Sequence, residues 1–122
     1  MEKHQLARNV FIGPQISGDD LICLRNEGFT DVICNRPDEE HPEGMTAEKL
    51  SEIAARLGMA FHYHPVAPGT AFDDAAEKMG AISARPNAKV FAYCRTGARS
   101  SKIWALSNTC LGRFEARNKP AA

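Results

Sequence analysis

The alternation of short apolar strands and amphipathic helices constrains the fold of this chain more than any other feature. Apolar runs predict strands over residues 10–12, 31–34, 60–66 and 89–93. Apolar spacing and helix-end signals predict helices in the segments 19–28, 46–58, 72–85 and from Ser100 or Ser101 onward. Strict alternation of this kind is typical of a mostly parallel sheet. We therefore expect a three-layer α/β fold, with four to five strands and helices on both faces.

Length and composition fit one globular domain. A chain of 122 residues, 43% of them hydrophobic, can bury a single core of two or three layers. The periodicity is lost near the end, so we expect a single domain over residues 1–112 and a disordered tail over 113–122. The acidic segment 38–44 is predicted to be a solvated loop.

Charge and hydropathy argue against several classes of function. Lys plus Arg and Asp plus Glu both number 15, whereas a nucleic-acid-binding protein is expected to carry a basic excess. No apolar run approaches the roughly 20 residues of a membrane-spanning helix. The first residues lead into nothing that resembles a signal peptide. We expect a cytoplasmic protein that binds neither nucleic acid nor membrane, so any anion binding must be local.

The loop 93–100, Tyr-Cys-Arg-Thr-Gly-Ala-Arg-Ser, combines the features of an anion site. The preceding strand delivers Cys94 to the carboxyl edge of the sheet, where open α/β folds bind ligands. Gly97 permits a tight curve of inward N–H groups, and the next helix begins at the same point. Arg99 adds a planar fork of donors. These features favour the thiolate, so we expect a lowered pKa of Cys94 and a nucleophilic sulfur.

The rest of the loop is predicted to form an anion-binding ring around the catalytic pair Cys94 and Arg99. Its members are Arg95, Thr96, Gly97, Ala98 and Ser100. Arg95 is expected to point toward solvent or substrate. The hydroxyls of Thr96 and Ser100 can bind the sulfur, cap the following helix, or do both. A buried structural cysteine followed by a basic turn is the simpler alternative, which this combination of residues disfavours.

Two families resemble this sequence at the loop and around it. Residues 94–100 resemble the active loop of rhodanese-type sulfurtransferases, which has the form Cys-x4-Arg. The wider pattern is similar to the phosphatase-like domain of β-lactamase-hydrolase-like proteins, the DUF442 family. The matching segments are 13–16, 28–33, 35–40, 64–66 and the cysteine loop through 106. The resemblance implies a fold like that of dual-specificity tyrosine phosphatases. It also implies a persulfide dioxygenase domain, fused or separate, as a partner in sulfide metabolism.

The size of the loop separates two enzymatic functions. The tyrosine-phosphatase signature is Cys-x5-Arg, and the ring that is one residue shorter here is better matched to a terminal sulfur. A phosphatase of this type also needs a general acid, and the loop 65–70 contains none. Asp73 and Asp74 follow it, but they are more simply explained as charges in the first turn of a helix.

We therefore predict a sulfurtransferase that forms a persulfide on Cys94 from thiosulfate or a low-molecular-weight persulfide. Its acceptor would be a thiol such as glutathione, and its substrate a small anion. The first alternative is a phosphohydrolase with Cys94 as nucleophile and Arg99 as phosphate clamp. The second is a non-enzymatic anion-sensing or docking module.

Two further pairs of side chains are candidates: Arg36 and Asp38, at the same edge of the sheet, and His62 and His64, on one strand. Arg36 and Asp38 are predicted either to bind substrate or to form a structural ion pair. His62 and His64 alternate along a strand and share one face. The residues after them lack the Asp-His expected of a metallo-hydrolase. We expect no metal and no cofactor.

All four cysteines are expected to be free thiols. Cys23, Cys34, Cys94 and Cys110 form no Cys-x-x-Cys pair, so neither a zinc site nor a redox pair is indicated. Cys34 ends a strand at the edge that carries Cys94. A role in resolving a persulfide stands beside the simpler role of a core cysteine, and Cys110 is predicted to lie in the core.

Overall fold

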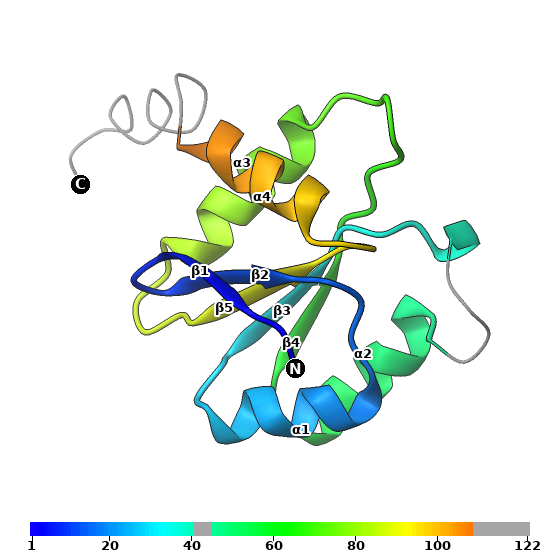
Figure 1. Cartoon of the computed structure of the whole chain (residues 1–122). Helices are drawn as coiled ribbons and strands as arrows, with labels where there is room; N and C mark the ends of the chain where they lie inside the picture. The colour runs from blue at the N-terminus through cyan, green and yellow to red at the C-terminus, as the bar shows by residue number, and fades with distance from the viewer. Residues whose placement is uncertain (41–44, 109–122) are drawn as a thin grey trace.

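The chain folds into a sheet between two helical layers (Figure 1). The computed structural model describes residues 1–40 and 45–108. Helices α1 (Gly18–Asn26) and α2 (Ala47–Arg56) cover one face of the sheet. Helices α3 (Asp73–Ser83) and α4 (Ala98–Ser107) cover the other. The predicted three-layer α/β fold is confirmed.

The sheet has five strands in the order β1-β2-β5-β3-β4. They are β1 (His4–Ala7), β2 (Val10–Gly13), β3 (Asp31–Cys34), β4 (Ala60–Tyr63) and β5 (Val90–Tyr93). β2, β5, β3 and β4 run parallel, and β1 pairs antiparallel with β2. β1 was not expected as a strand, because its largely exposed side chains leave no apolar pattern in the sequence.

The central strand β5 places its last residue beside the ends of both neighbours. Tyr93 stands in register with Gly13 of β2 and with Cys34 of β3. Every residue of β5 is buried, as expected for an apolar run in the middle of a parallel sheet. Residues that leave β2, β3 and β5 at their carboxyl ends therefore meet at one point.

The two faces of the sheet carry separate cores. Phe91 and Tyr93 pack with Leu21 and Leu50 beneath α1 and α2. The alternate residues of β5 pack beneath α3 and α4, in a cluster that contains Val90, Ala92, Met79 and Ile103. This division follows from the alternation of side chains along a strand.

Several element boundaries differ from those predicted. The predicted strand 60–66 ends at Tyr63, and the next residues form a loop. Helix α1 is capped by Ser17, which forms a capping box with Asp20, rather than by Asp19 and Asp20. Helix α4 begins at Ala98, earlier than expected, because the left-handed Gly97 already turns the chain.

The acidic segment is not simply a solvated loop. Asp38–Glu40 forms one turn of 3-10 helix, and its last residue is only partly exposed. Cys110 and the predicted tail over 113–122 lie outside the described residues. In the described part of the chain, no helix combines the length and the apolar character needed to cross a membrane.

Candidate functional site

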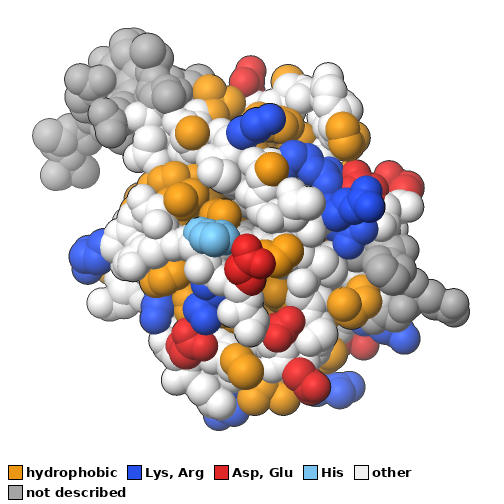
Figure 2. All heavy atoms as spheres, in the orientation of Figure 1, with side chains coloured by type: hydrophobic (Ala, Val, Ile, Leu, Met, Phe, Trp, Pro, Cys, Tyr) orange, Lys and Arg blue, Asp and Glu red, His pale blue; other side chains and the backbone are white. Residues whose placement is uncertain are grey.

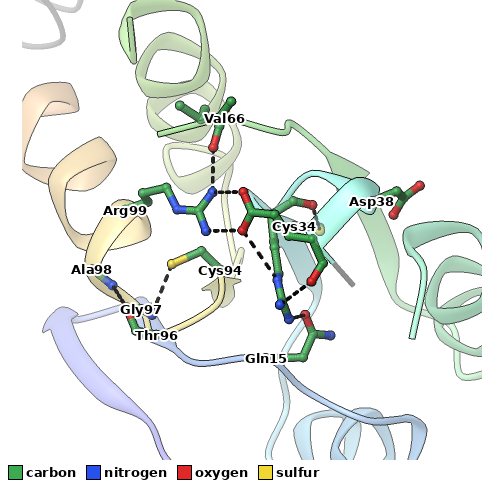
Figure 3. A network of polar contacts seen from close by, with 12 residues as sticks. Gln15, Cys34, Asp38, Val66, Cys94, Thr96, Gly97, Ala98 and Arg99 are labelled. Atoms are coloured by element: carbon green, nitrogen blue, oxygen red, sulfur yellow. Dashed lines mark hydrogen bonds and ion pairs between the residues drawn. The ribbon is translucent and has the colours of Figure 1, made fainter. Parts of the chain in front are cut away.

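The cysteine loop closes over the carboxyl end of β5, as predicted. Cys94 is 1% exposed, and its backbone N–H donates to the carbonyl of Gly13 at 3.4 Å. Gly97 adopts φ +96, the left-handed region that favours glycine. This turn brings the Gly97 N–H to 3.1 Å from the Cys94 sulfur (Figure 3). The loop therefore curls around the sulfur and leads directly into α4.

Two glycines, Gly13 and Gly97, allow close packing where the cysteine loop meets the end of β2. A Cβ placed on Gly97 would lie 3.3 Å from the carbonyl carbon of Gly13. A Cβ on Gly13 would lie 2.5 Å from the backbone oxygen of Glu2 and 2.9 Å from the ring of Phe91. The close approach of the loop to β2 therefore depends on Gly97 lacking a side chain, whereas the missing side chain of Gly13 leaves room for Glu2 and the ring of Phe91.

The pKa of Cys94 is lowered even though the residue is buried. Burial alone raises the pKa, because it disfavours the thiolate. Backbone N–H groups directed at the sulfur outweigh this effect, and they belong to Ser100, Thr96, Gly97 and Arg99. The thiolate is the nucleophilic form of cysteine. The geometry therefore supplies the activated sulfur that the sequence predicts.

Arg99 reaches across the sulfur from the first turn of α4. Its guanidinium lies beside the Cys94 side chain in Figure 3. A bidentate pair joins Arg99 to Glu40, with Nη1 at 2.9 Å from Oε2 and Nη2 at 2.6 Å from Oε1. Nη1 also donates to the carbonyl of Val66 at 2.8 Å. Hydrogen bonds from Arg99 hold the pKa of Glu40 below its usual range, so Glu40 is ionised.

Arg36 lies behind Glu40 rather than in the anion ring. Its side chain is 8% exposed, and Nη1 donates to Oε1 of Gln15 at 3.0 Å. Nη2 donates to the backbone carbonyl of Glu40. Its ion-pair partner here is Glu40, with Nε 3.7 Å from Oε1. This placement favours a supporting role over the direct substrate contact that the sequence left open.

Asp38 is placed apart from the sulfur. Its carboxylate accepts a hydrogen bond from the backbone N–H of Ala47, at the first residue of α2, at 3.0 Å. Figure 3 shows it pointing away from Cys94 and Arg99. A carboxylate at a helix N-terminus is stabilising, so this position favours a structural role for Asp38 over the substrate contact, between which the sequence left the choice open.

The remaining loop residues are either exposed at the outer edge of the site or buried beneath it. Arg95, Thr96 and Ala98 are exposed at the rim. The Thr96 hydroxyl accepts from the N–H of Ala98, the first residue of α4, at 3.3 Å, while the N-cap position itself is Gly97. Ser100 is fully buried, and its hydroxyl donates to Oδ1 of Asn35 at 2.9 Å. Its backbone N–H, not its hydroxyl, acts on the sulfur.

Asn35 ties three loops together beneath the site. It is fully buried, and its side-chain amide donates to the carbonyl of His64 at 3.0 Å while it accepts from Ser100. Its own carbonyl accepts from the N–H of Val66 at 3.0 Å. The loops after β3, β4 and β5 are thereby locked to one another.

Cys34 differs from Cys94 although both end a strand. Its sulfur donates to the carbonyl of Arg36 at 3.3 Å, and burial raises its pKa to about 11. A thiol with a raised pKa is a poor nucleophile at neutral pH. The role of a core cysteine fits these surroundings better than the role of a resolving thiol.

His62, in β4, and His64, just after it, do not form a metal site with their surroundings. Nε2 of His62 lies 2.7 Å from Oδ2 of the buried Asp31. Burial, together with Lys78 and His62, lowers the pKa of His64. Among residues 1–40 and 45–108 there is no group of three potential ligands that could hold a metal ion.

Glu40, Asn35 and Gln15 were not predicted as site residues. The sequence did place 35–40 at the carboxyl edge of the sheet, which is the one signal that pointed to them. The acidic composition of 38–44 concealed Glu40, because charged segments are usually solvated. On the face drawn in Figure 2, basic side chains gather at the upper right beside acidic ones, and elsewhere acidic and basic side chains are intermixed.

Comparison with known proteins agrees with the resemblance stated for the sequence. The family model of the phosphatase-like domain of β-lactamase hydrolase-like proteins matches residues 3–111. A β-lactamase hydrolase-like protein of Xylella fastidiosa is 29% identical over 85% of this chain. One of Agrobacterium fabrum is 32% identical over 79% of it. The matches cover 24% and 22% of these relatives, so the chain spans about a quarter of their length.

Solved structures share the same fold. A protein of Neisseria meningitidis, provisionally assigned as a phosphatase, superposes with a TM-score of 0.74 at 27% identity, covering 95% of this chain and 78% of that one. A DUF442 protein of Shewanella putrefaciens gives 0.68 at 17% identity, over 95% and 70%. The catalytic domain of a PP-IP phosphatase of S. cerevisiae gives 0.63 at 16% identity, over 98% and 77%. The last two comparisons show the fold alone.

The prediction of a phosphatase-like enzyme with a cysteine nucleophile is thereby confirmed at the level of family and fold. The finer prediction of a sulfurtransferase is not, and the phosphohydrolase alternative agrees better with the relatives. The chain belongs to the family of the phosphatase-like domain of β-lactamase hydrolase-like proteins.

Proposed function

We propose that this protein is a phosphohydrolase that forms a phosphocysteine on Cys94. The observation that carries the proposal is the Cys94 sulfur, which is activated by a ring of backbone N–H groups and lies beside the guanidinium of Arg99. Such a ring suits the equatorial oxygens of a phosphoryl group, whose negative charge is spread over three atoms. The family and the Neisseria relative support the same chemistry.

The reaction would proceed in two displacements. The Cys94 thiolate attacks phosphorus, an S–P bond forms, and the leaving-group oxygen departs with the electron pair of its P–O bond. Water then attacks the phosphocysteine, the S–P bond breaks, and inorganic phosphate leaves as the thiolate is regenerated. Arg99 and the backbone N–H groups stabilise the charge on the phosphoryl oxygens in both steps.

The leaving group is expected to need little help from an acid. The carboxyl group bonded to Arg99 is that of Glu40, and Arg99 keeps it ionised. An ionised carboxylate cannot donate the proton that an alkoxide leaving group requires. We therefore propose substrates whose leaving group has a low pKa, such as aryl phosphates or phosphoanhydrides.

Turnover of p-nitrophenyl phosphate tests this proposal directly. The wild type should release nitrophenolate, and Cys94→Ser should lower kcat/KM at least about 10³-fold, because the nucleophile is lost. Cys23→Ser is the matched control, since it removes an exposed thiol outside the loop. Absence of turnover in the wild type between about pH 5 and pH 8 would contradict the proposal.

Sulfur transfer remains a second candidate, because the Cys94–Arg99 spacing is one residue shorter than in tyrosine phosphatases and no acid is needed. In this reaction the thiolate attacks a sulfane sulfur, sulfite leaves, and the persulfide passes to a thiol such as glutathione. The intact mass after incubation with thiosulfate decides it. A gain of one sulfur that is absent in Cys94→Ser, without phosphate turnover, would establish this function instead.

A further inference from the structure

The donors of Arg99 are divided between two edges of its guanidinium. A guanidinium carries five N–H donors in a fixed plane. Nη1 uses both of its hydrogens, on Oε2 of Glu40 and on the Val66 carbonyl, and Nη2 uses one on Oε1 of Glu40. Within residues 1–40 and 45–108, these bonds leave the Nε hydrogen and the second Nη2 hydrogen, apart from a hydrogen bond between Arg99 and the Cys94 side chain. These two lie along the edge next to Cys94 (Figure 3).

Glu40 is itself held in place by Arg36. Arg36 donates through Nη2 to the Glu40 carbonyl and lies 3.7 Å from its carboxylate. Nη1 of Arg36 bonds Gln15, whose backbone N–H donates to the carbonyl of Arg95 at 3.4 Å. The contacts therefore run from the cysteine loop through Gln15, Arg36 and Glu40 back to Arg99. Glu40 and Arg36 are 25% and 8% exposed, so this support is mostly shielded from water.

We propose that Glu40 is a positioning residue of the anion site. It occupies the terminal Nη1/Nη2 edge of Arg99 and so reserves the Nε/Nη2 edge for two oxygens of a tetrahedral oxyanion bound over Cys94. Arg36 keeps Glu40 in place. The proposal rests on the phosphoryl-binding cradle proposed above, and it assigns to Glu40 an effect that is exerted entirely through Arg99.

This role and a simple charge effect predict opposite results when Glu40 loses its charge. Glu40→Gln removes a negative charge beside the site, and electrostatics alone would then tighten the binding of an anion. If Glu40 positions Arg99, the same change releases the guanidinium. The fixed bidentate geometry is then lost and binding weakens.

The experiment measures the dissociation constant of inorganic phosphate from the chemical shift of the Gly97 amide in ¹⁵N-labelled protein. The same spectrum shows whether each variant is folded. Glu40→Gln should weaken phosphate binding about tenfold, and Glu40→Asp should weaken it similarly. The aspartate variant keeps the charge but is too short to reach both nitrogens. The matched control is Glu39→Gln, an exposed neighbour that should change the affinity little.

A double-variant test isolates the route of the effect. In an Arg99→Ala background, Glu40→Gln should cause no further weakening, because the residue through which it acts is gone. Unchanged or tighter binding in Glu40→Gln alone would overturn the proposal, as would an equal loss in both backgrounds. The absence of any phosphate-induced shift in the wild type would also overturn it. Phosphate binding without turnover would contradict only the proposed function, because this measurement requires no catalysis.

Discussion

At the residue scale, two buried cysteines at one edge of the sheet have pKa values shifted in opposite directions. Burial raises the pKa of Cys34 to about 11. Cys94 is equally hidden, yet its pKa is lowered. The N–H groups of the loop converge on the Cys94 sulfur, whereas the Cys34 thiol contacts the carbonyl of Arg36 and the side chain of Tyr93. Local hydrogen-bond geometry, not burial, therefore separates the reactive thiol from the core thiol.

The pKa of Cys94 should lie below the ordinary cysteine value of about 8.5. Because a lowered pKa means that the thiolate persists to more acidic pH, one thiolate transition of the wild type should fall below the ordinary cysteine range and should be absent in Cys94→Ser. A pH titration of absorbance at about 240 nm measures this. Cys34→Ser, which removes a thiol of raised pKa, should leave this transition unchanged. An ordinary pKa for Cys94 would favour a docking module over an enzyme.

Ser100→Ala should destabilise the fold. The substitution removes the hydroxyl that donates to the buried Oδ1 of Asn35 and leaves that acceptor without its partner. A loss of about 1–3 kcal/mol in the free energy of unfolding is expected in urea denaturation. Ser101→Ala, one position along α4 and partly exposed, is the matched control and should cost less. Equal stability of the two variants would argue against the Asn35 contact.

At the element scale, the strand-loop-helix unit formed by β5, the cysteine loop and α4 depends on one backbone conformation. Gly97 has φ +96 and packs against the backbone of Gly13. Any other residue there meets both an unfavourable φ and a close contact with β2. The curvature that directs N–H groups at the sulfur therefore originates in a position that only glycine fits well.

Gly97→Ala should lower both stability and phosphate affinity. The left-handed conformation alone costs an alanine about 1–2 kcal/mol, and the contact with Gly13 adds to it. Thermal unfolding and the phosphate titration measure the two effects. Gly80→Ala is the matched control, because it lies within α3 and its Cβ would meet Ser107 at an ordinary 3.8 Å. That variant should be neutral or slightly more stable.

At the scale of the whole molecule, a second polar network ties the sheet to α3. Asp31 is 2% exposed and contacts His62 of β4 and Arg85 just after α3, and it accepts from the hydroxyl of Thr30 at 2.6 Å. Burial raises its pKa, but the bonds from Thr30, His62 and Arg85 outweigh burial, so the pKa is lowered. The network joins elements that are far apart in the sequence.

Asp31 should contribute stability that depends on pH. Because its folded pKa lies below the unfolded value of about 3.9, the contribution is complete above that pH and is lost as the pH falls through the folded pKa. Asp31→Asn should therefore be less stable than the wild type by about 2 kcal/mol at neutral pH. The difference should shrink in denaturation curves recorded below about pH 4. Asp74→Asn, at an exposed ion pair, should show little difference at either pH.

The layers, the parallel strands and the reactive loop could be predicted from the amino-acid sequence, because they depend on local apolar spacing and on residues that are consecutive in the chain. Cys94, Gly97 and Arg99 act from one turn, so their chemistry was readable without a structure. Tertiary structure alone revealed that Glu40 holds Arg99, that Arg36 supports Glu40, and that Asn35 locks Ser100. These partners are 59, 4 and 65 positions apart. Residue type does not reveal such pairings across loops, because the packing of strand ends decides them.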